Sequence, residues 1–88
     1  MQDEPVGVTR PQLALWWLRE GGLVVGPDWA RAHEICQEAE GERAFDLVHA
    51  LCHWIEGDMA NRDYWYRRVA RVPAATIGAE WEALATLM

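Results

Sequence analysis

The side chains of this sequence that could do chemistry are three histidines and two cysteines, all between residues 33 and 53. Four of them follow the order His33-x2-Cys36-x12-His49-x3-His53, which is close to the ligand spacing of a zinc finger. A zinc finger of that kind needs two cysteines on a β-hairpin turn as its first ligand pair. Here the first pair lies in the segment 32–37, which has no turn residue and is predicted to be mid-helix. The spacing therefore indicates a site built on helices.

A helical hairpin could bring the three imidazoles to one divalent metal ion. His49 and His53 are four residues apart and Glu56 follows three residues later, so their side chains share one helix face. His33 lies eight residues before Gly41 and His49 eight residues after it, which places both at the same height in an antiparallel hairpin. One hand of the hairpin brings His33 and His49 face to face, whereas the other hand separates them. The metal hypothesis assigns Zn²⁺ or Ni²⁺ to His33, His49, His53 and Glu56.

The same helix face is also a candidate surface for a protein partner or a small ligand. Glu42 and Asp46 continue the stripe of the histidines, roughly opposite the apolar side, so we expect the imidazoles on an outer, polar face. Six tryptophans exceed what so small a core hides easily, which predicts self-association into a homo-oligomer. A binding or interaction module is our first interpretation, and metal binding or metal sensing is the alternative. The predicted surface consists of His33, Glu34, His49, His53, Glu56, Asn61, Tyr64, Arg67 and Arg68.

Catalysis has less support in the sequence. The chain contains no Lys and no Ser, which excludes a Schiff-base lysine, a Gly-Lys-Ser/Thr phosphate loop and a serine nucleophile. Cys36 and Cys52 lie on predicted apolar faces, where thiols are usually inert. They lie five and eleven residues from Gly41, a mismatch of about 9 Å in height that argues against a disulfide. The sequence therefore favours a protein that is not an enzyme.

Charge restricts the class of partner. Fourteen acidic residues against eight arginines give a formal net charge of −6, so duplex nucleic acid and anionic membranes are repelled. The predicted helix that follows Asp58 is a basic exception, because it carries Arg62, Arg67, Arg68 and Arg71. We interpret Arg67, Arg68 and Arg71 as a solvated face that also pairs with acids of neighbouring helices. A contact with an anion or an acidic peptide is the functional alternative.

Length and patterning predict a single domain. Eighty-eight residues suffice for one small core, and we expect a helical domain over 9–88 after a flexible N-terminus over 1–8. The longest uninterrupted apolar run, residues 13–18, is too short to span a membrane. No basic segment followed by an apolar stretch begins the sequence, so we expect a cytoplasmic protein with reduced cysteines.

The elements that must position the candidate residues are helices with clear start and stop signals. A first helix is expected between a capping box at Thr9 and the glycines 21–22. A second helix should begin at Pro27 and end at Gly41. A third is expected over 42–55, where apolar residues cover about half of the helical circumference. So wide an apolar arc predicts that this third helix is the most buried one.

Two further helices complete the expected fold. Asp58 is placed to cap a helix over 59–72, which Pro73 ends. Apolar side chains recur at positions 81, 84, 85 and 88, which predicts a last helix running to the C-terminus. No segment alternates between apolar and polar residues as a half-buried strand would. The sequence predicts an all-α fold of four to five antiparallel helices, arranged as helical hairpins or as a small orthogonal bundle.

One run of residues carries a resemblance to a known family. Residues 49–58 read His-Ala-Leu-Cys-His-Trp-Ile-Glu-Gly-Asp, followed by Asn61 and by Tyr-Trp-Tyr-Arg-Arg at 64–68. Together with Ala-His-Glu at 32–34, this pattern resembles a family of short, largely bacterial helical proteins of unknown function. The resemblance covers roughly residues 29–71. It implies that one signature includes His33, Glu34, His49, His53, Glu56, Asp58, Asn61 and the aromatic and basic run.

Residues 57–66 also resemble the second half of a tetratricopeptide unit. In such a unit Gly-Asp opens the return helix, as Gly57 and Asp58 would here, and an aromatic residue packs against the partner helix. Arg62 departs from that pattern, which has a small alanine there, and no second copy follows at a period of roughly 34 residues. The resemblance implies a helical hairpin rather than an extended solenoid.

Overall fold

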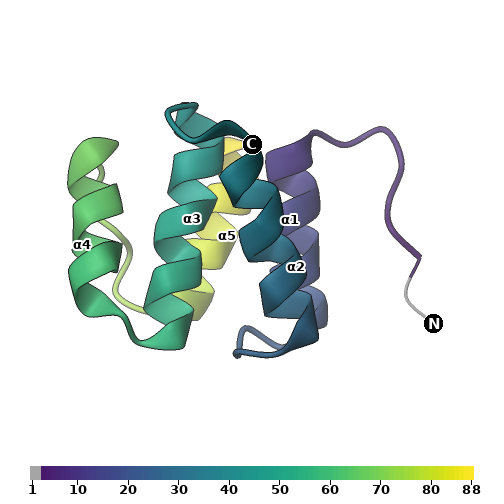
Figure 1. Ribbon diagram of the computed structural model, residues 1–88, viewed down its shortest axis with the longest axis horizontal. Helices are drawn as coiled ribbons and strands as arrows, with labels where there is room; N and C mark the ends of the chain where they lie inside the picture. Colours follow the sequence, from purple (N-terminus) through teal and green to yellow (C-terminus); the bar gives the residue numbers. More distant parts are fainter. Residues whose placement is uncertain (1–2) are drawn as a thin grey trace.

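The computed structural model describes residues 3–88, and within them the chain forms five α-helices (Figure 1). The helices are α1 (Arg10–Glu20), α2 (Pro27–Cys36), α3 (Arg43–Glu56), α4 (Met59–Arg68) and α5 (Ile77–Leu87), and a 3₁₀ turn over Gln37–Ala39 follows α2. Helix α4 packs on α3 through a smaller cluster beside the main core. No strand occurs in this part of the chain, so the predicted all-α class is confirmed. A search of the described residues for a helix of membrane-spanning length and apolarity finds none.

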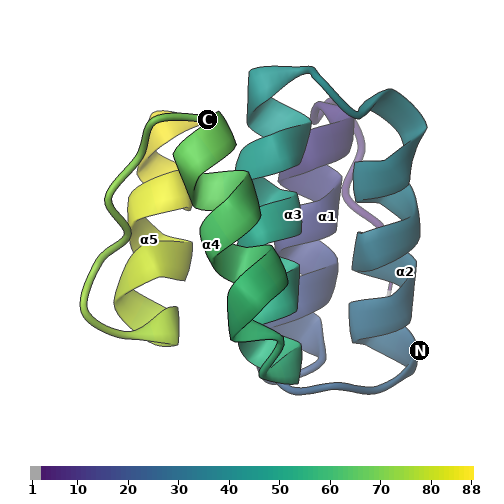
Figure 2. The same cartoon turned by 60° about the vertical axis from the view of Figure 1, so that its left-hand side comes forward.

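Helix α3 lies at the centre and contacts each of the other four helices. Figures 1 and 2 show α4 on one side of α3, and α1 with α2 on the other. Val48 and Leu51 of α3 are fully buried and share one core with Leu18 of α1, Ile35 of α2 and Leu84 of α5. Full burial of such side chains contributes roughly 1.5–3 kcal/mol each. The prediction that the third helix is the most buried is therefore confirmed.

Local capping signals begin the helices where the sequence predicts them. The Thr9 hydroxyl accepts from the Gln12 N–H and the Gln12 amide oxygen accepts from the Thr9 N–H, which closes the capping box of α1. The Asp58 carboxylate accepts from the Asn61 N–H and caps α4. Gly57 ends α3 with φ of 83°, a left-handed conformation that glycine adopts without strain.

The second helix ends earlier than expected. Its α-helical part stops at Cys36 instead of Gly41, because residues 37–39 tighten into the 3₁₀ turn. The N–H of Gly41 then donates to the Asp46 carboxylate, with N to O distances of 3.1 and 3.2 Å. This carboxylate is buried, so its hydrogen bonds from Gly41 anchor the turn between α2 and α3.

The fourth helix also ends early, at Arg68 instead of residue 72. Ala70 takes a φ of 54°, and the Arg71 N–H donates back to the Tyr66 carbonyl. This is the hydrogen bond of a left-handed helix end, at a position where glycine is the usual residue. Because residue 70 is alanine and not glycine, the residue type at this position did not indicate the end of the helix.

The early end of α4 directs one arginine towards α5. The Arg71 guanidinium donates to both oxygens of Glu80 at 2.9 and 2.8 Å, and Glu80 is fully buried. The Ala74 N–H donates to the same carboxylate at 3.0 Å. Burial raises the pKa of Glu80, but the hydrogen bonds from Arg71 and Ala74 outweigh it, so the pKa lies below its ordinary value. The predicted pairing of basic side chains with acids of a neighbouring helix is confirmed at this pair.

The segment before α1 lies against that helix. Glu4 accepts a hydrogen bond from Trp17 Nε1 at 2.9 Å and lies 4.0 Å from the Arg31 guanidinium. The predicted flexible N-terminus covered residues 1–8, of which Met1 and Gln2 lie outside the described residues.

Candidate metal centre

Three imidazoles from α2 and α3 come together beside the core. The ring centroids of His33 and His49 lie 4.9 Å apart, those of His33 and His53 5.3 Å, and those of His49 and His53 4.8 Å. Nε2 of His33 lies 3.2 Å from Nε2 of His49. Each ring offers one nitrogen within 4.8 Å of the nitrogens of the other two. The hairpin of α2 and α3 therefore has the hand that brings His33 and His49 face to face.

The two imidazoles of α3 lie inside the protein, so the expected outer, polar face is wrong for His49 and His53, while His33 is half-buried. His49 is 3% exposed and His53 is 9% exposed, and Asp46 on the same stripe is also buried. The reason is tertiary, because α4 folds back over the side of α3 that the helical pattern left free. Trp65 of α4 stacks on the ring of His49, with 4.3 Å between centroids and an interplanar angle of 26°.

Two tryptophans form walls on either side of the cluster. Trp29 of α2 stacks on His33, with centroids 5.0 Å apart and an interplanar angle of 7°. Its Nε1 donates to the Cys52 carbonyl at 2.9 Å, which holds the indole between α2 and α3. The spacing of four residues between Trp29 and His33 signals this contact on one helix face. The stacking of Trp65 on the cluster has no such local signal, because it depends on how α4 packs.

Burial and mutual repulsion keep two of the imidazoles neutral. Removal from water lowers the pKa of His49 to about 4, and the charges of His33 and His53 act in the same direction. The pKa of His33 is also lowered, first by burial and then by the charge of His53. At neutral pH both rings therefore carry a free nitrogen lone pair, which is the form that binds metal ions.

His49 is also incompletely hydrogen-bonded. Its Nε2 faces His33, but Nδ1 is buried and has no hydrogen-bond partner among the described residues. A buried nitrogen without a partner costs roughly 1–3 kcal/mol of stability. Such groups are rare in folded proteins and are found preferentially at functional sites.

Glu56 reaches the cluster through His53. Its carboxylate Oε2 lies 2.6 Å from Nδ1 of His53, three residues earlier on α3. Asp58 belongs with this pair to a second group of possible ligands whose atoms lie within 4.8 Å of one another. The carboxylate of Asp58, however, accepts from both the backbone N–H and the side-chain Nδ2 of Asn61, which lowers its pKa. Asp58 therefore serves the start of α4, and Glu56 is the carboxylate that meets an imidazole.

The remaining residues of the predicted surface lie outside the cluster. Glu34 is exposed, with a carboxylate oxygen 3.8 Å from Arg31, and Asn61 is an exposed first-turn residue of α4. The Arg68 guanidinium donates to the Tyr64 hydroxyl at 3.2 Å and lies 5.0 Å above the Trp65 ring. The structure thus places an exposed tyrosine and an arginine next to the tryptophan that covers His49. Arg67 is exposed on the same helix.

The two cysteines are buried and free in the core beside the cluster. An interaction with the Cys36 thiol, together with burial, raises the pKa of the Cys52 thiol well above its ordinary value. Counting residues along an antiparallel hairpin predicted a difference of about 9 Å in height, whereas the two thiols interact; both cysteines are nevertheless free, as expected. The Cys52 thiol therefore stays protonated at neutral pH and is a poor metal ligand in that form.

Comparisons with protein-family models, with curated proteins and with solved structures find no match for this chain. The resemblance to a family of short helical proteins and the partial tetratricopeptide pattern stay predictions. The candidate site is accordingly judged on its own geometry.

Proposed function

We propose that this protein binds one divalent metal ion of the zinc class through His33, His49 and His53. The observation that carries the proposal is the distance of 3.2 Å between Nε2 of His33 and Nε2 of His49. A tetrahedral zinc ion, at about 2.0–2.1 Å from each nitrogen, holds two such ligands about 3.3 Å apart. His53 supplies a third nitrogen within reach of both. Metal binding thus replaces the interaction module as our first interpretation.

The electrostatics of the site favour a cation over a proton. The lowered pKa values of His33 and His49 keep these rings neutral at physiological pH. A metal ion therefore does not have to displace a proton from either ring. The formal net charge of −6 attracts divalent cations to the protein. Stacking by Trp29 and Trp65 holds two of the rings in place, so few rotamers are lost when the ion binds.

Glu56 has the role of a positioning residue in this proposal. A carboxylate on one nitrogen of a histidine fixes its tautomer and makes the other nitrogen a better metal ligand. The contact between Glu56 and Nδ1 of His53 has this arrangement, which leaves Nε2 of His53 for the metal ion. The sequence predicts Glu56 as a metal ligand, whereas its contact with Nδ1 of His53 favours the supporting role.

Three protein ligands leave one position of a tetrahedral ion for water or another small ligand. His33 is the only one of the three histidines that is not classed as buried, so the centre meets solvent on the side of α2. A zinc ion with three nitrogen ligands and one open position lowers the pKa of bound water. The proposal is limited to metal binding.

The test is a titration of chelator-treated protein with Zn²⁺, followed by calorimetry at pH 7.5, with Co²⁺ as a spectroscopic substitute. We expect one ion per chain and the visible absorption of tetrahedral cobalt. His33→Ala removes a ligand that is not fully buried, so the fold is kept, and affinity should fall at least about 100-fold. Glu56→Gln should weaken binding by about 10–100-fold, as outer-sphere changes do.

The matched control is Glu34→Ala, which removes the exposed neighbour of His33 and should leave the affinity unchanged. Wild-type protein that binds Zn²⁺ no better than His33→Ala would refute the proposal. Equal losses of Zn²⁺ affinity in Glu34→Ala and His33→Ala would also refute the proposal, because the loss in His33→Ala would then not be specific to a metal ligand.

A further inference from the structure

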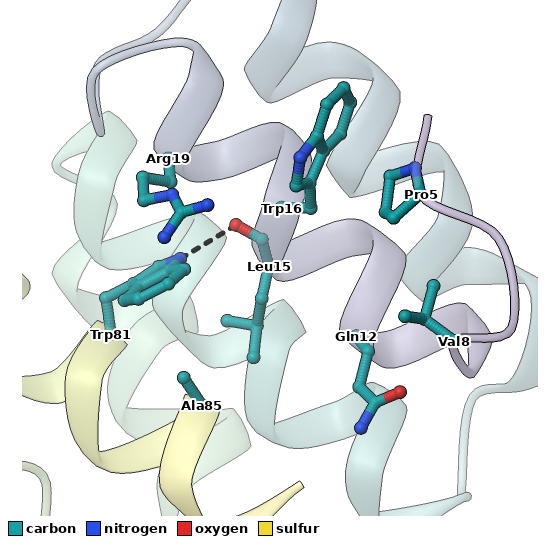
Figure 3. A pocket seen from close by; sticks show the side chains of 8 residues that line it. All are labelled: Pro5, Val8, Gln12, Leu15, Trp16, Arg19, Trp81 and Ala85. Carbon is teal, nitrogen blue, oxygen red and sulfur yellow. Dashed lines mark hydrogen bonds between the residues drawn. The ribbon is translucent and has the colours of Figure 1, made fainter. Parts of the chain in front are cut away.

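A second candidate site lies between α1, α5 and the segment before α1, and no residue of the proposed metal centre lines it. It is a pocket of about 200 Å³ that opens to solvent (Figure 3). Its apolar walls are formed by Pro5, Val8, Leu15, Trp16, Trp81 and Ala85. Such a concave, mostly apolar pocket with few polar groups is the usual form of a small-molecule site.

Hydrogen bonds tie the walls of this pocket together. Trp81 Nε1 of α5 donates to the Leu15 carbonyl of α1 at 2.8 Å, the bond drawn in Figure 3. The Gln12 amide is also fully used, because its Nε2 donates to the Met88 carbonyl at 2.5 Å while its oxygen caps α1. The pocket is therefore held open by the same contacts that join the two helices, and a ligand would not have to order it.

One charged side chain lines the pocket. The Arg19 guanidinium lies 5.2 Å from the centroid of the Trp81 ring, at the mouth of the pocket (Figure 3). Within residues 3–88 it forms no ion pair, although the chain carries fourteen acidic residues. Arg19 is exposed, and its planar fork of donors matches the two oxygens of a carboxylate. The amide oxygen and nitrogen of Gln12 each already have a hydrogen-bond partner, which leaves Arg19 as the charged group for a ligand.

We propose that this pocket binds a small aromatic monocarboxylate, with the ring between Trp16 and Trp81 and the carboxylate on Arg19. The volume limits the size of the ligand, because a dry cavity of roughly 150 Å³ already holds benzene. About 200 Å³ therefore accommodates one ring with a short acidic chain. The two tryptophans supply faces for stacking, and the single cation selects an anion over a neutral molecule of equal shape.

The experiment compares 3-phenylpropionate with its neutral amide on uniformly ¹⁵N-labelled protein treated with a chelator, so that no metal ion can bind the carboxylate. Amide and indole N–H resonances report where each compound binds. We expect the acid to shift the indole signals of Trp81 and Trp16, with a Kd of roughly 0.1–5 mM for a ligand of this size. The neutral amide should bind at least about fivefold more weakly.

Two variants and one control separate the contributions. Arg19→Gln should bring the affinity for the acid down to that for the amide and leave the amide unchanged. Ala85→Leu places a larger side chain at the exposed rim and should abolish binding of both compounds. Arg67→Gln removes the same charge from the exposed face of α4 and should change neither affinity.

Each other outcome overturns the proposal. Acid and amide of equal affinity in wild-type protein would remove the role of Arg19. Shifts confined to residues around His33 and His53 would place the anion at the imidazoles. Absence of any saturable shift up to 20 times the expected Kd would show that the pocket does not take this class of ligand.

Discussion

Replacing His49 by leucine should stabilise the metal-free protein while abolishing its response to zinc. The Nδ1 atom of His49 is buried without a hydrogen-bond partner among the described residues, which costs roughly 1–3 kcal/mol. Leucine is apolar and close in volume, so it removes that cost. The change loses the contact between Nε2 of His49 and His33, worth roughly 0.5–1.5 kcal/mol. The net expectation is a gain of about 1 kcal/mol for His49→Leu.

This gain in the free energy of unfolding, divided by the entropy of unfolding, gives the expected shift in melting temperature. An entropy of about 2.1 cal/mol/K per residue gives about 185 cal/mol/K for a chain of 88 residues. The melting temperature of metal-free His49→Leu should therefore lie about 5 °C above that of metal-free wild type. Zinc at a hundred times its Kd adds about 2.7 kcal/mol to the wild type, or roughly 15 °C. The order of the two proteins should consequently reverse when zinc is added.

The assay is a thermal scan by circular dichroism of chelator-treated protein, with and without Zn²⁺. His33→Leu is the matched control, because it removes a proposed ligand without removing the orphaned nitrogen of His49. It should lose the zinc response without gaining stability. If metal-free His49→Leu melts more than 5 °C below metal-free wild type, the buried Nδ1 of His49 does not destabilise the folded protein. If it still rises by about 15 °C with zinc, His49 is not a ligand.

Further predictions concern pH, the buried ion pair and the helix ends, and urea unfolding measures each of them. The pKa of His49 is about 4 in the folded chain against about 6.5 unfolded, so the unfolded state takes up the proton first. The free energy of unfolding of metal-free protein should fall by about 3 kcal/mol between pH 6.5 and 4, and by clearly less in His49→Leu. Arg71→Ala should cost roughly 3–5 kcal/mol, since Glu80 would stay buried without its cation, and a loss below 1 kcal/mol would contradict this. Ala70→Gly should add about 0.5 kcal/mol by relieving the φ of 54°, with no gain expected if the helix end rearranges. Thr9→Ala should cost about 1 kcal/mol through the lost cap, whereas Thr9→Ser should cost little.

Helix positions were predictable wherever a local hydrogen bond or a fixed dihedral angle sets them. The capping box at Thr9 and the cap at Asp58 act within one turn of chain, so residue types alone predict them. The end of α4 was not predictable in this way. Ala70 takes a left-handed conformation that alanine disfavours, because the buried carboxylate of Glu80 draws Arg71 towards α5. That interaction joins two helices and leaves no mark on the local sequence.

The features of the candidate site also separate into those that the local sequence predicts and those that tertiary packing sets. The spacing of His49 and His53 places both on one side of α3, which any helix of this sequence would do. Helical periodicity also indicated that this side was polar, and from this we expected it to face solvent. The structure buries it because α4 packs on this side of α3 and Trp65 stacks on the ring of His49. Lowered pKa values and an unsatisfied nitrogen follow from that cover, and neither could be derived from residue types.

The residue pattern alone predicts that the chain is helical, which helix is central, and that His49, His53 and Glu56 share one helix face. These properties depend on periodicity and on capping, which act over a few residues. Only the tertiary structure decided that His33 faces His49 and that the cluster lies inside the protein. Both follow from the hand of the α2–α3 hairpin and the packing of α4, and these are set by contacts between distant residues across the whole core.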